Sequence, residues 1–129
     1  MTVNLTSEVH GAILALASQH HPREACGLLF GTDTAITAHL PARNVHPTPE
    51  SHFEIDPQAL IDAHRAMRGG GPRLIGYYHS HPRGPARPSA TDRAMAAGDG
   101  MIWAIAGEGE LRLWRDGKNG FAALSYTRV

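Results

Sequence analysis

Residues 74–82, LIGYYHSHP, join an apolar run to a pair of histidines. The apolar and aromatic side chains of residues 74–78, with a single glycine among them, predict a buried strand. Residues i and i+2 of a strand project to the same side. His79 and His81 can therefore direct both imidazoles at one point just past the end of this strand.

The next ten residues predict a fixed loop and then a short helix. Pro82, Pro85 and Pro88 restrict the backbone of the loop. Ser89 has Asp92 three residues later, which is the capping-box spacing at the start of a helix. Such a helix would bring Asp92 back to the histidines as a third ligand and place its positive dipole end beside any oxyanion formed there.

Two histidines and one carboxylate favour a catalytic zinc site, because such sites take three protein ligands and keep the fourth position for water. Each part has an ordinary explanation when taken alone. A Ser-x-x-Asp sequence is usually only a helix cap, and a lone histidine at a strand end is usually structural or solvated. The combination on one strand–loop–helix unit favours the metal site, with iron or manganese as alternatives to zinc.

A second segment, residues 24–31 with the sequence EACGLLFG, predicts another core strand. Glu24 lies at the entrance of that strand. A carboxylate there can face a metal-bound water and act as a general base. The ordinary alternative is an exposed residue at a junction between a helix and a strand.

Together these residues resemble the JAMM (Mov34/MPN/PAD-1) metalloprotease signature of the small, stand-alone prokaryotic type. The resemblance rests on Glu24, the His79-Ser80-His81 pair, a seven-residue gap and Ser89-x-x-Asp92. Further family positions are matched less specifically by Asn44 and residues 53–57. The resemblance spans about residues 7–106, and no motif position departs from the pattern, which disfavours an inactive scaffold.

The resemblance implies a role for each residue of the signature. His79, His81 and Asp92 would bind zinc, and water would fill the fourth position. Glu24 would take a proton from that water and pass one to the leaving amine. Ser89 would help to hold the oxyanion, and one hydroxyl can do so while it also caps the helix.

The resemblance also implies a peptidase or isopeptidase that acts at the carboxyl-terminal tail of a ubiquitin-like sulfur-carrier protein. Such a tail can add a strand beside the sheet and enter the site past Ser80 and Pro82. The alternatives are a relative of the RadC-type proteins associated with DNA repair, or a non-catalytic scaffold or binding domain. The family is often dimeric, so a homodimer is possible.

The composition of the chain limits its number of domains, its partners and its location. The 129 residues predict a single domain, 1–129, and Lys plus Arg equal Asp plus Glu at 12 each. This balance gives no basic field for nucleic acid. Cys26 is the only cysteine, which excludes an internal disulfide, fits a reducing cytoplasm and predicts a buried core thiol. No basic signal segment precedes the apolar stretch at 12–17, and no run approaches the about 20 apolar residues of a membrane span.

The remaining patterns give the order of elements. Helices are predicted from Ser7 through Ala17, at 56–68 and at 89–97, and strands at 28–30, 35–40, 53–55, 74–78, 101–106, 111–114 and 121–126. This order predicts an α/β fold in which a mixed β-sheet is flanked by helices. The resemblance implies the cytidine-deaminase-like MPN/JAMM form of that fold. A deaminase itself is excluded because its zinc site needs Cys-x-x-Cys.

Overall fold

The computed structural model describes residues 2–129, which form seven strands and three helices. In chain order these are β1 (Thr2–Leu5), α1 (Ser7–His20), β2 (Cys26–Thr32), β3 (Ala35–Ala42), α2 (Pro57–Arg68), β4 (Leu74–His81), α3 (Ala90–Met95), β5 (Ile102–Gly107), β6 (Glu110–Gly117) and β7 (Gly120–Arg128).

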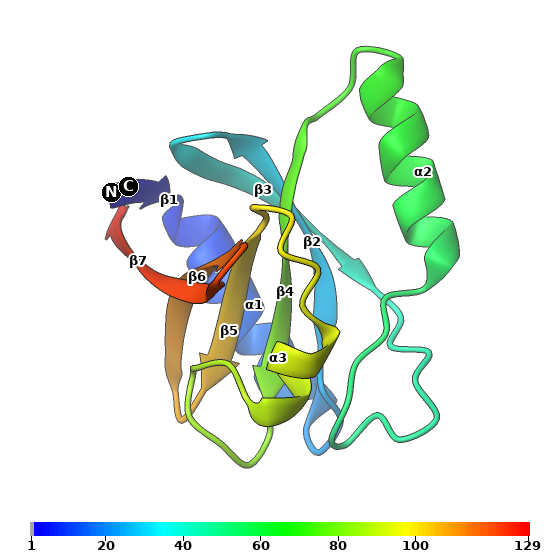
Figure 1. The fold of residues 1–129 in the computed structure, drawn as a ribbon, viewed down its shortest axis with the longest axis vertical. Coiled ribbons are helices and arrows are strands. Elements are labelled where there is room, and N and C mark those ends of the chain that lie inside the picture. The colour runs from blue at the N-terminus through cyan, green and yellow to red at the C-terminus, as the bar shows by residue number, and fades with distance from the viewer. Residues whose placement is uncertain (1) are drawn as a thin grey trace.

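The strands form one mixed sheet in the order β1-β3-β2-β4-β5-β6-β7 (Figure 1). The strand that carries the two histidines, β4, is central, because it pairs antiparallel with β2 and parallel with β5. The N-terminal strand β1 pairs parallel with both β3 and β7, which closes the sheet into a barrel and brings the two chain ends together (Figure 1). The predicted α/β fold with a mixed sheet and flanking helices is therefore confirmed.

The closure of the sheet has no signal in the sequence patterns. Residues 2–5, TVNL, contain two apolar side chains in four positions, which is too short a run to show the alternation of a strand. Both apolar side chains of β1, Val3 and Leu5, are fully buried. They add to the core that the barrel encloses.

Both faces of the central strands are covered. One face packs against α1, whose Val9 and Ile13 are buried. The opposite face packs against residues from the segment before α2 and from α2 itself, notably Phe53 and Ala63. Strands buried on both faces consist of nearly continuous apolar runs, as β5 does with its wholly buried sequence IWAIAG.

Side-chain caps, a proline and a glycine mark the boundaries of α1 and α2. The side chain of Thr6 accepts a hydrogen bond from the amide of Val9 at the start of α1, and that of Asp56 accepts from Gln58 at the start of α2. The second helix has Pro57 at its first position and ends before Gly69. Over residues 2–129, no helix is both long and apolar enough to span a membrane.

Three predicted elements differ from the structure. The strand predicted at 74–78 continues through His81, so both histidines lie within β4 rather than past its end. The strand predicted at 53–55 is wrong, because this segment makes only an isolated bridge between Ile55 and Asn44. Its apolar side chains are buried by packing against the sheet rather than by joining it. The helix predicted at 89–97 ends at Met95, since Ala96 takes an extended conformation.

Candidate metal centre

The two histidines lie at the carboxyl end of β4, where the sheet passes into the proline-rich loop. His79 is paired with Cys26 of β2 on one side and with Ile105 of β5 on the other. It is fully buried, and His81 is half-buried at the mouth of the site. The strand thus holds one imidazole inside the protein and the other at its surface.

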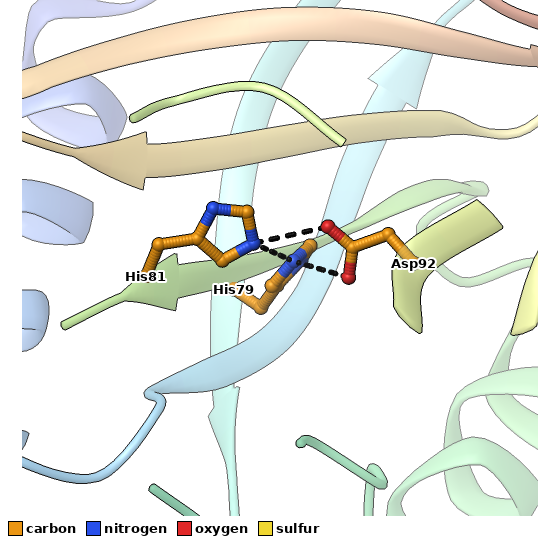
Figure 2. A group of neighbouring side chains, drawn as sticks. All are labelled: His79, His81 and Asp92. Carbon is orange, nitrogen blue, oxygen red and sulfur yellow. Dashed lines mark hydrogen bonds and ion pairs between the residues drawn. The ribbon is translucent and has the colours of Figure 1, made fainter. Parts of the chain in front are cut away.

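The structure brings together the three predicted ligands (Figure 2). Nε2 of His79 lies 3.0 Å from Oδ1 of Asp92, and Nε2 of His81 lies 3.0 Å from Oδ2 of the same carboxylate. The two Nε2 atoms are 3.1 Å apart. All three ligand atoms lie within 4.8 Å of one another, so one ion can contact all of them.

The proton positions in this cluster favour a cation at its centre. Nδ1 of His81 lies 2.8 Å from the carbonyl oxygen of Pro85, which can only accept, so Nδ1 carries the proton. Neutral His81 then directs the lone pair of Nε2 at a carboxylate oxygen of Asp92. That contact is repulsive unless a proton or a metal ion lies between the two atoms. A backbone carbonyl that fixes the other ring nitrogen is the usual support for a metal-binding histidine.

The same electrostatics set the direction of each pKa in the cluster. Burial lowers the pKa of His79. Burial also disfavours the charged form of His81, but hydrogen bonds to Asp92 and Pro85 outweigh it and raise the pKa. Burial would raise the pKa of Asp92, yet the two histidines hold it well below its usual range. The carboxylate is therefore ionised, as a metal ligand must be.

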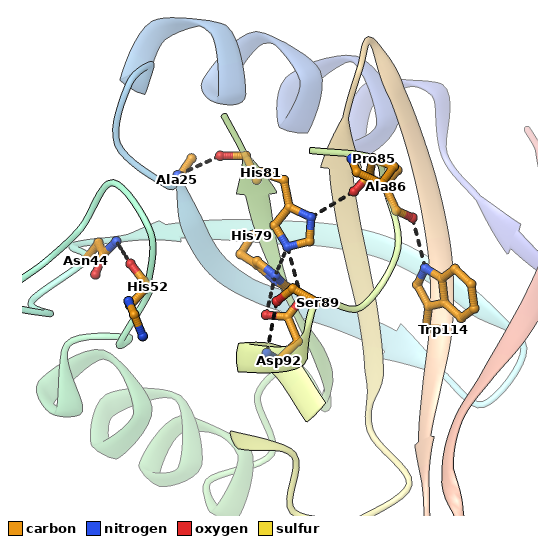
Figure 3. A network of polar contacts seen from close by, with 11 residues as sticks. Ala25, Asn44, His52, His79, His81, Pro85, Ala86, Ser89, Asp92 and Trp114 are labelled. Carbon is orange, nitrogen blue, oxygen red and sulfur yellow. Dashed lines mark hydrogen bonds and ion pairs between the residues drawn. The ribbon is translucent and has the colours of Figure 1, made fainter. Parts of the chain in front are cut away.

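The first turn of α3 fixes Asp92 (Figure 3). Its backbone amide donates to Oγ of Ser89 over 3.1 Å, and its Oδ2 accepts from the amide of Ser89 over 3.0 Å. The predicted capping box is thus present. Because the Ser89 oxygen accepts from the backbone, its hydroxyl proton is free to point outward.

Glu24 lies beside this cluster and is 5% exposed, so the ordinary alternative of an exposed junction residue is wrong. Burial raises the pKa of its carboxyl to about 7, with nearby His81 lowering it and Asp92 raising it. The backbone amide of Glu24 donates to the carbonyl of Pro49 over 2.7 Å. A carboxyl with this pKa is suited to exchanging protons near neutral pH.

Two polar side chains fix the backbone around Glu24. Oγ of Ser80, between the two histidines, accepts from the amide of Ala25 over 2.8 Å. The Ser80 amide returns a hydrogen bond to the Ala25 carbonyl over 3.0 Å. Nδ2 of Asn44 donates to the carbonyls of Glu24 and His52 (Figure 3). The strand that bears the histidines is thereby joined directly to the segment that bears Glu24.

Aromatic rings complete the inner wall, a role that the sequence patterns did not assign to them. Phe53 stacks on the imidazole of His79, with centroids 4.2 Å apart and planes at 17°. Trp103 of β5 meets the same imidazole edge-on at 5.6 Å. These contacts fix the plane of the His79 ring and exclude water from its inner side.

A cavity of about 800 Å³ opens beside this cluster. His81, Glu24 and Ser89 lie on its wall, together with the loop segments 47–51 and 82–88. Trp114 holds the second of these loops by donating from Nε1 to the carbonyl of Ala86 over 3.1 Å (Figure 3). A substrate in this cavity would therefore meet the three residues together.

Cys26 is the buried thiol that its apolar neighbours predict. Burial, with the charge of Glu24, raises its pKa to about 12. The thiol is therefore protonated at neutral pH, and it acts as part of the core rather than as a nucleophile.

The sequence matches a known family over most of its length. Residues 6–117 match the family described as prokaryotic homologs of the JAB domain. The chain belongs to this family. The JAB/JAMM family and the MPN/JAMM fold that the sequence predicted are thus confirmed.

Individual members of the JAB/JAMM family agree. A desampylase from Haloferax volcanii is 34% identical over 109 residues, which cover 80% of this chain and 78% of that protein. A CysO-cysteine peptidase from Mycobacterium tuberculosis is 31% identical over 94 residues, which cover 71% of this chain and 64% of that protein. A solution structure of a protein from Desulfitobacterium hafniense superposes with a TM-score of 0.85 at 31% identity, covering 99% of this chain and 93% of that one. The chain is accordingly a JAMM-type hydrolase.

Proposed function

We propose that this protein is a zinc-dependent peptidase that hydrolyses an amide bond at or near the carboxyl-terminal tail of a ubiquitin-like sulfur-carrier protein. One observation carries the proposal. A convergent set of two histidines and one carboxylate lies at the edge of the same cavity as a buried glutamate whose pKa is about 7.

His79, His81 and Asp92 would hold the metal ion. Two imidazole nitrogens and one carboxylate oxygen are the ligands that zinc takes in catalytic sites. When bound, zinc would supply Lewis-acid activation of a water and of the scissile carbonyl. Burial of His79 and the Pro85 contact of His81 keep both imidazoles oriented without further movement.

Glu24 would move the protons of the reaction. As a carboxylate it would accept a proton from the attacking water, and as a carboxylic acid it would donate that proton to the leaving amine. A pKa of about 7 makes both forms accessible at neutral pH. The anchoring of its backbone to Pro49 and Asn44 holds the carboxyl at the cavity wall.

Ser89 would stabilise the negative charge that develops on the scissile carbonyl oxygen. Its oxygen already accepts from the amide of Asp92, and its remaining proton can be donated into the cavity. One positioned donor of this kind typically contributes a factor of about 10² to 10³ in rate.

The substrate class rests on two observations of different kinds. The relatives from Haloferax volcanii and Mycobacterium tuberculosis are named desampylase and CysO-cysteine peptidase. The cavity is also an open recess between two loops, which suits an extended tail better than a folded surface.

The single-domain organisation, cytoplasmic location and possible homodimer stay predictions.

The decisive experiment compares the wild type with His79→Ala and Glu24→Gln. Metal content is measured by elemental analysis, and cleavage is measured on a sulfur-carrier-type tail that ends in Gly-Gly plus one residue. We expect about one zinc per wild-type chain, loss of zinc and cleavage in His79→Ala, and retained zinc without turnover in Glu24→Gln. Absence of metal after preparation without chelators, with no activity on adding zinc, would contradict the mechanism. Full activity of Glu24→Gln would remove Glu24 from it.

A further inference from the structure

The cavity beside the metal centre has a charge that the whole protein lacks. The formal net charge of the chain is zero, yet Arg23, Arg83 and Arg87 all line this cavity. The carboxylates on its wall are those of Glu24 and Glu50. The three arginines outnumber these two carboxylates, so the wall carries a net positive charge even when both glutamates are ionised.

The positive charge of these three arginines is not neutralised within the protein. Among residues 2–129, the arginine ion pairs are those of Arg73 with Asp33 and of Arg112 with Glu110, both away from the cavity. The cavity arginines are exposed and come from two segments, one before β2 and one after β4. Guanidinium groups gathered without carboxylate partners in a recess are suited to binding an anionic group of a ligand.

We propose that this cavity selects substrates whose leaving residue carries a free α-carboxylate. The inference rests on the proposed peptidase function and specifies its substrate. The protein would thus release a terminal amino acid from the tail in preference to cutting an isopeptide bond to a lysine side chain.

The position of Arg23 explains why the carboxylate belongs to the leaving residue. Glu24 would protonate the leaving amine, so the leaving side of the scissile bond lies next to Glu24. Arg23 is its immediate neighbour in the chain and shares the same cavity wall. In an amino acid the carboxylate is one carbon atom away from the amine, whereas the leaving nitrogen of a lysine isopeptide is separated from the backbone by four methylene groups.

The walls of the cavity are constrained before any ligand binds. Pro82, Pro85 and Pro88 restrict the loop that carries Arg83 and Arg87. The carbonyl of Pro85 accepts from His81, and the next carbonyl accepts from Trp114. Ordering of this loop therefore adds little to the entropic cost of binding. More of the free energy of the carboxylate–guanidinium interaction then contributes to the affinity.

The test uses three tail peptides that differ only after the Gly-Gly. The first ends in alanine with a free acid, the second in alanine amide, and the third in aspartate amide. The third peptide separates a terminal carboxylate from an acidic side chain as the anionic group. We would measure kcat/KM with the zinc-loaded wild type, and Kd by calorimetry with zinc-loaded Glu24→Gln.

We expect the free acid to be preferred over both amides by about tenfold, mainly through KM, because charge-assisted hydrogen bonds in a recess are stronger than exposed ion pairs. Arg23→Gln should reduce the ratio of acid to alanine amide to near one, by lowering kcat/KM for the free acid toward that for the amide. Arg83→Gln and Arg87→Gln should reduce the ratio partially. Arg68→Gln removes the same charge from the end of α2, outside the cavity, and should leave the ratio unchanged.

Equal cleavage of the free acid and the alanine amide would overturn the inference while the peptidase function stands. Equal kcat/KM values for the aspartate amide and the free acid would show that the cavity binds acidic side chains as well as a terminal carboxylate. This result would also overturn the inference. If no peptide is cleaved, the peptidase function fails, and the Kd values still decide on the carboxylate. A free acid that binds no more tightly than its amide refutes the selection.

Discussion

Glu24 should reduce the stability of the folded protein at neutral and alkaline pH, and its replacement by glutamine should recover that stability. Burial raises the pKa of the carboxyl from its usual 4.5 to about 7 in the folded protein. Between these two values the folded state holds a proton that the unfolded state has released. The free energy of unfolding therefore falls as pH rises through this range, and the loss is complete above pH 7.

The size of the loss follows from the two pKa values. At about 1.4 kcal/mol for each pH unit between them, the ionised carboxyl costs about 3 kcal/mol at pH 8. Glutamine has nearly the same shape and no charge, so Glu24→Gln should exceed the wild type by about this amount at pH 8 and by almost nothing at pH 4. In a domain of this size, the difference at pH 8 corresponds to about 10 °C in Tm.

Urea unfolding at pH 4, 6 and 8 measures the difference directly, with protein from which metal has been removed by a chelator. Glu50→Gln is the matched control, because Glu50 lies on the same cavity wall but is exposed. It should change stability by less than about 0.5 kcal/mol at every pH. A Glu24→Gln advantage that does not vary with pH would refute the reasoning, since a buried charge requires it to grow as pH rises.

Three further predictions concern packing, the helix cap and the thiol. Gly76→Ala should destabilise the protein by about 3 kcal/mol, because a Cβ would overlap the backbone carbonyl of Ile102. Gly11→Ala in open space on α1 should instead stabilise it by about 1 kcal/mol in the same urea measurement. Ser89→Ala should lower kcat by about 10²-fold and the free energy of unfolding by about 1 kcal/mol. Ser89→Thr keeps the hydroxyl and should retain most of both. Equal kcat values for Ser89→Ala and the wild type would exclude the oxyanion role. Cys26 should react with iodoacetamide at pH 8 about a thousandfold more slowly than a free thiol, because its pKa is about 12. Labelling is measured by mass spectrometry, and rapid labelling of the folded protein would contradict this.

The convergence of His79, His81 and Asp92 was predictable because its signals are local. The i, i+2 spacing of His79 and His81 on a strand and the capping box of Asp92 each lie within a few residues of sequence. Local geometry then directs these side chains at one point. The burial of Glu24 was not predictable in this way, because it depends on backbone contacts with Pro49 and Asn44, which lie some twenty or more residues away.

The parts that could not be predicted depend on contacts between distant segments. Phe53 lies in a segment whose apolar side chains resemble those of a strand, yet it packs on His79 from outside the sheet. Closure of the barrel requires residues 2–5 to pair with β7 at the other end of the chain. Neither arrangement is indicated by hydrophobic periodicity in the sequence. Each depends on which apolar surfaces of the sheet are still exposed once its other strands have paired.

The closed sheet and the buried site depend on each other. A fully buried imidazole such as His79 and a largely buried carboxyl such as Glu24 both lower the stability of the folded state. They can be tolerated only where the surrounding backbone has no alternative arrangement. The central position of β4, paired on both edges, provides this, because an edge strand would admit water and let His79 turn away from Asp92. The stability that Glu24 removes is therefore supplied by the barrel, which allows a glutamate to be held at a position where glutamine would be more stable.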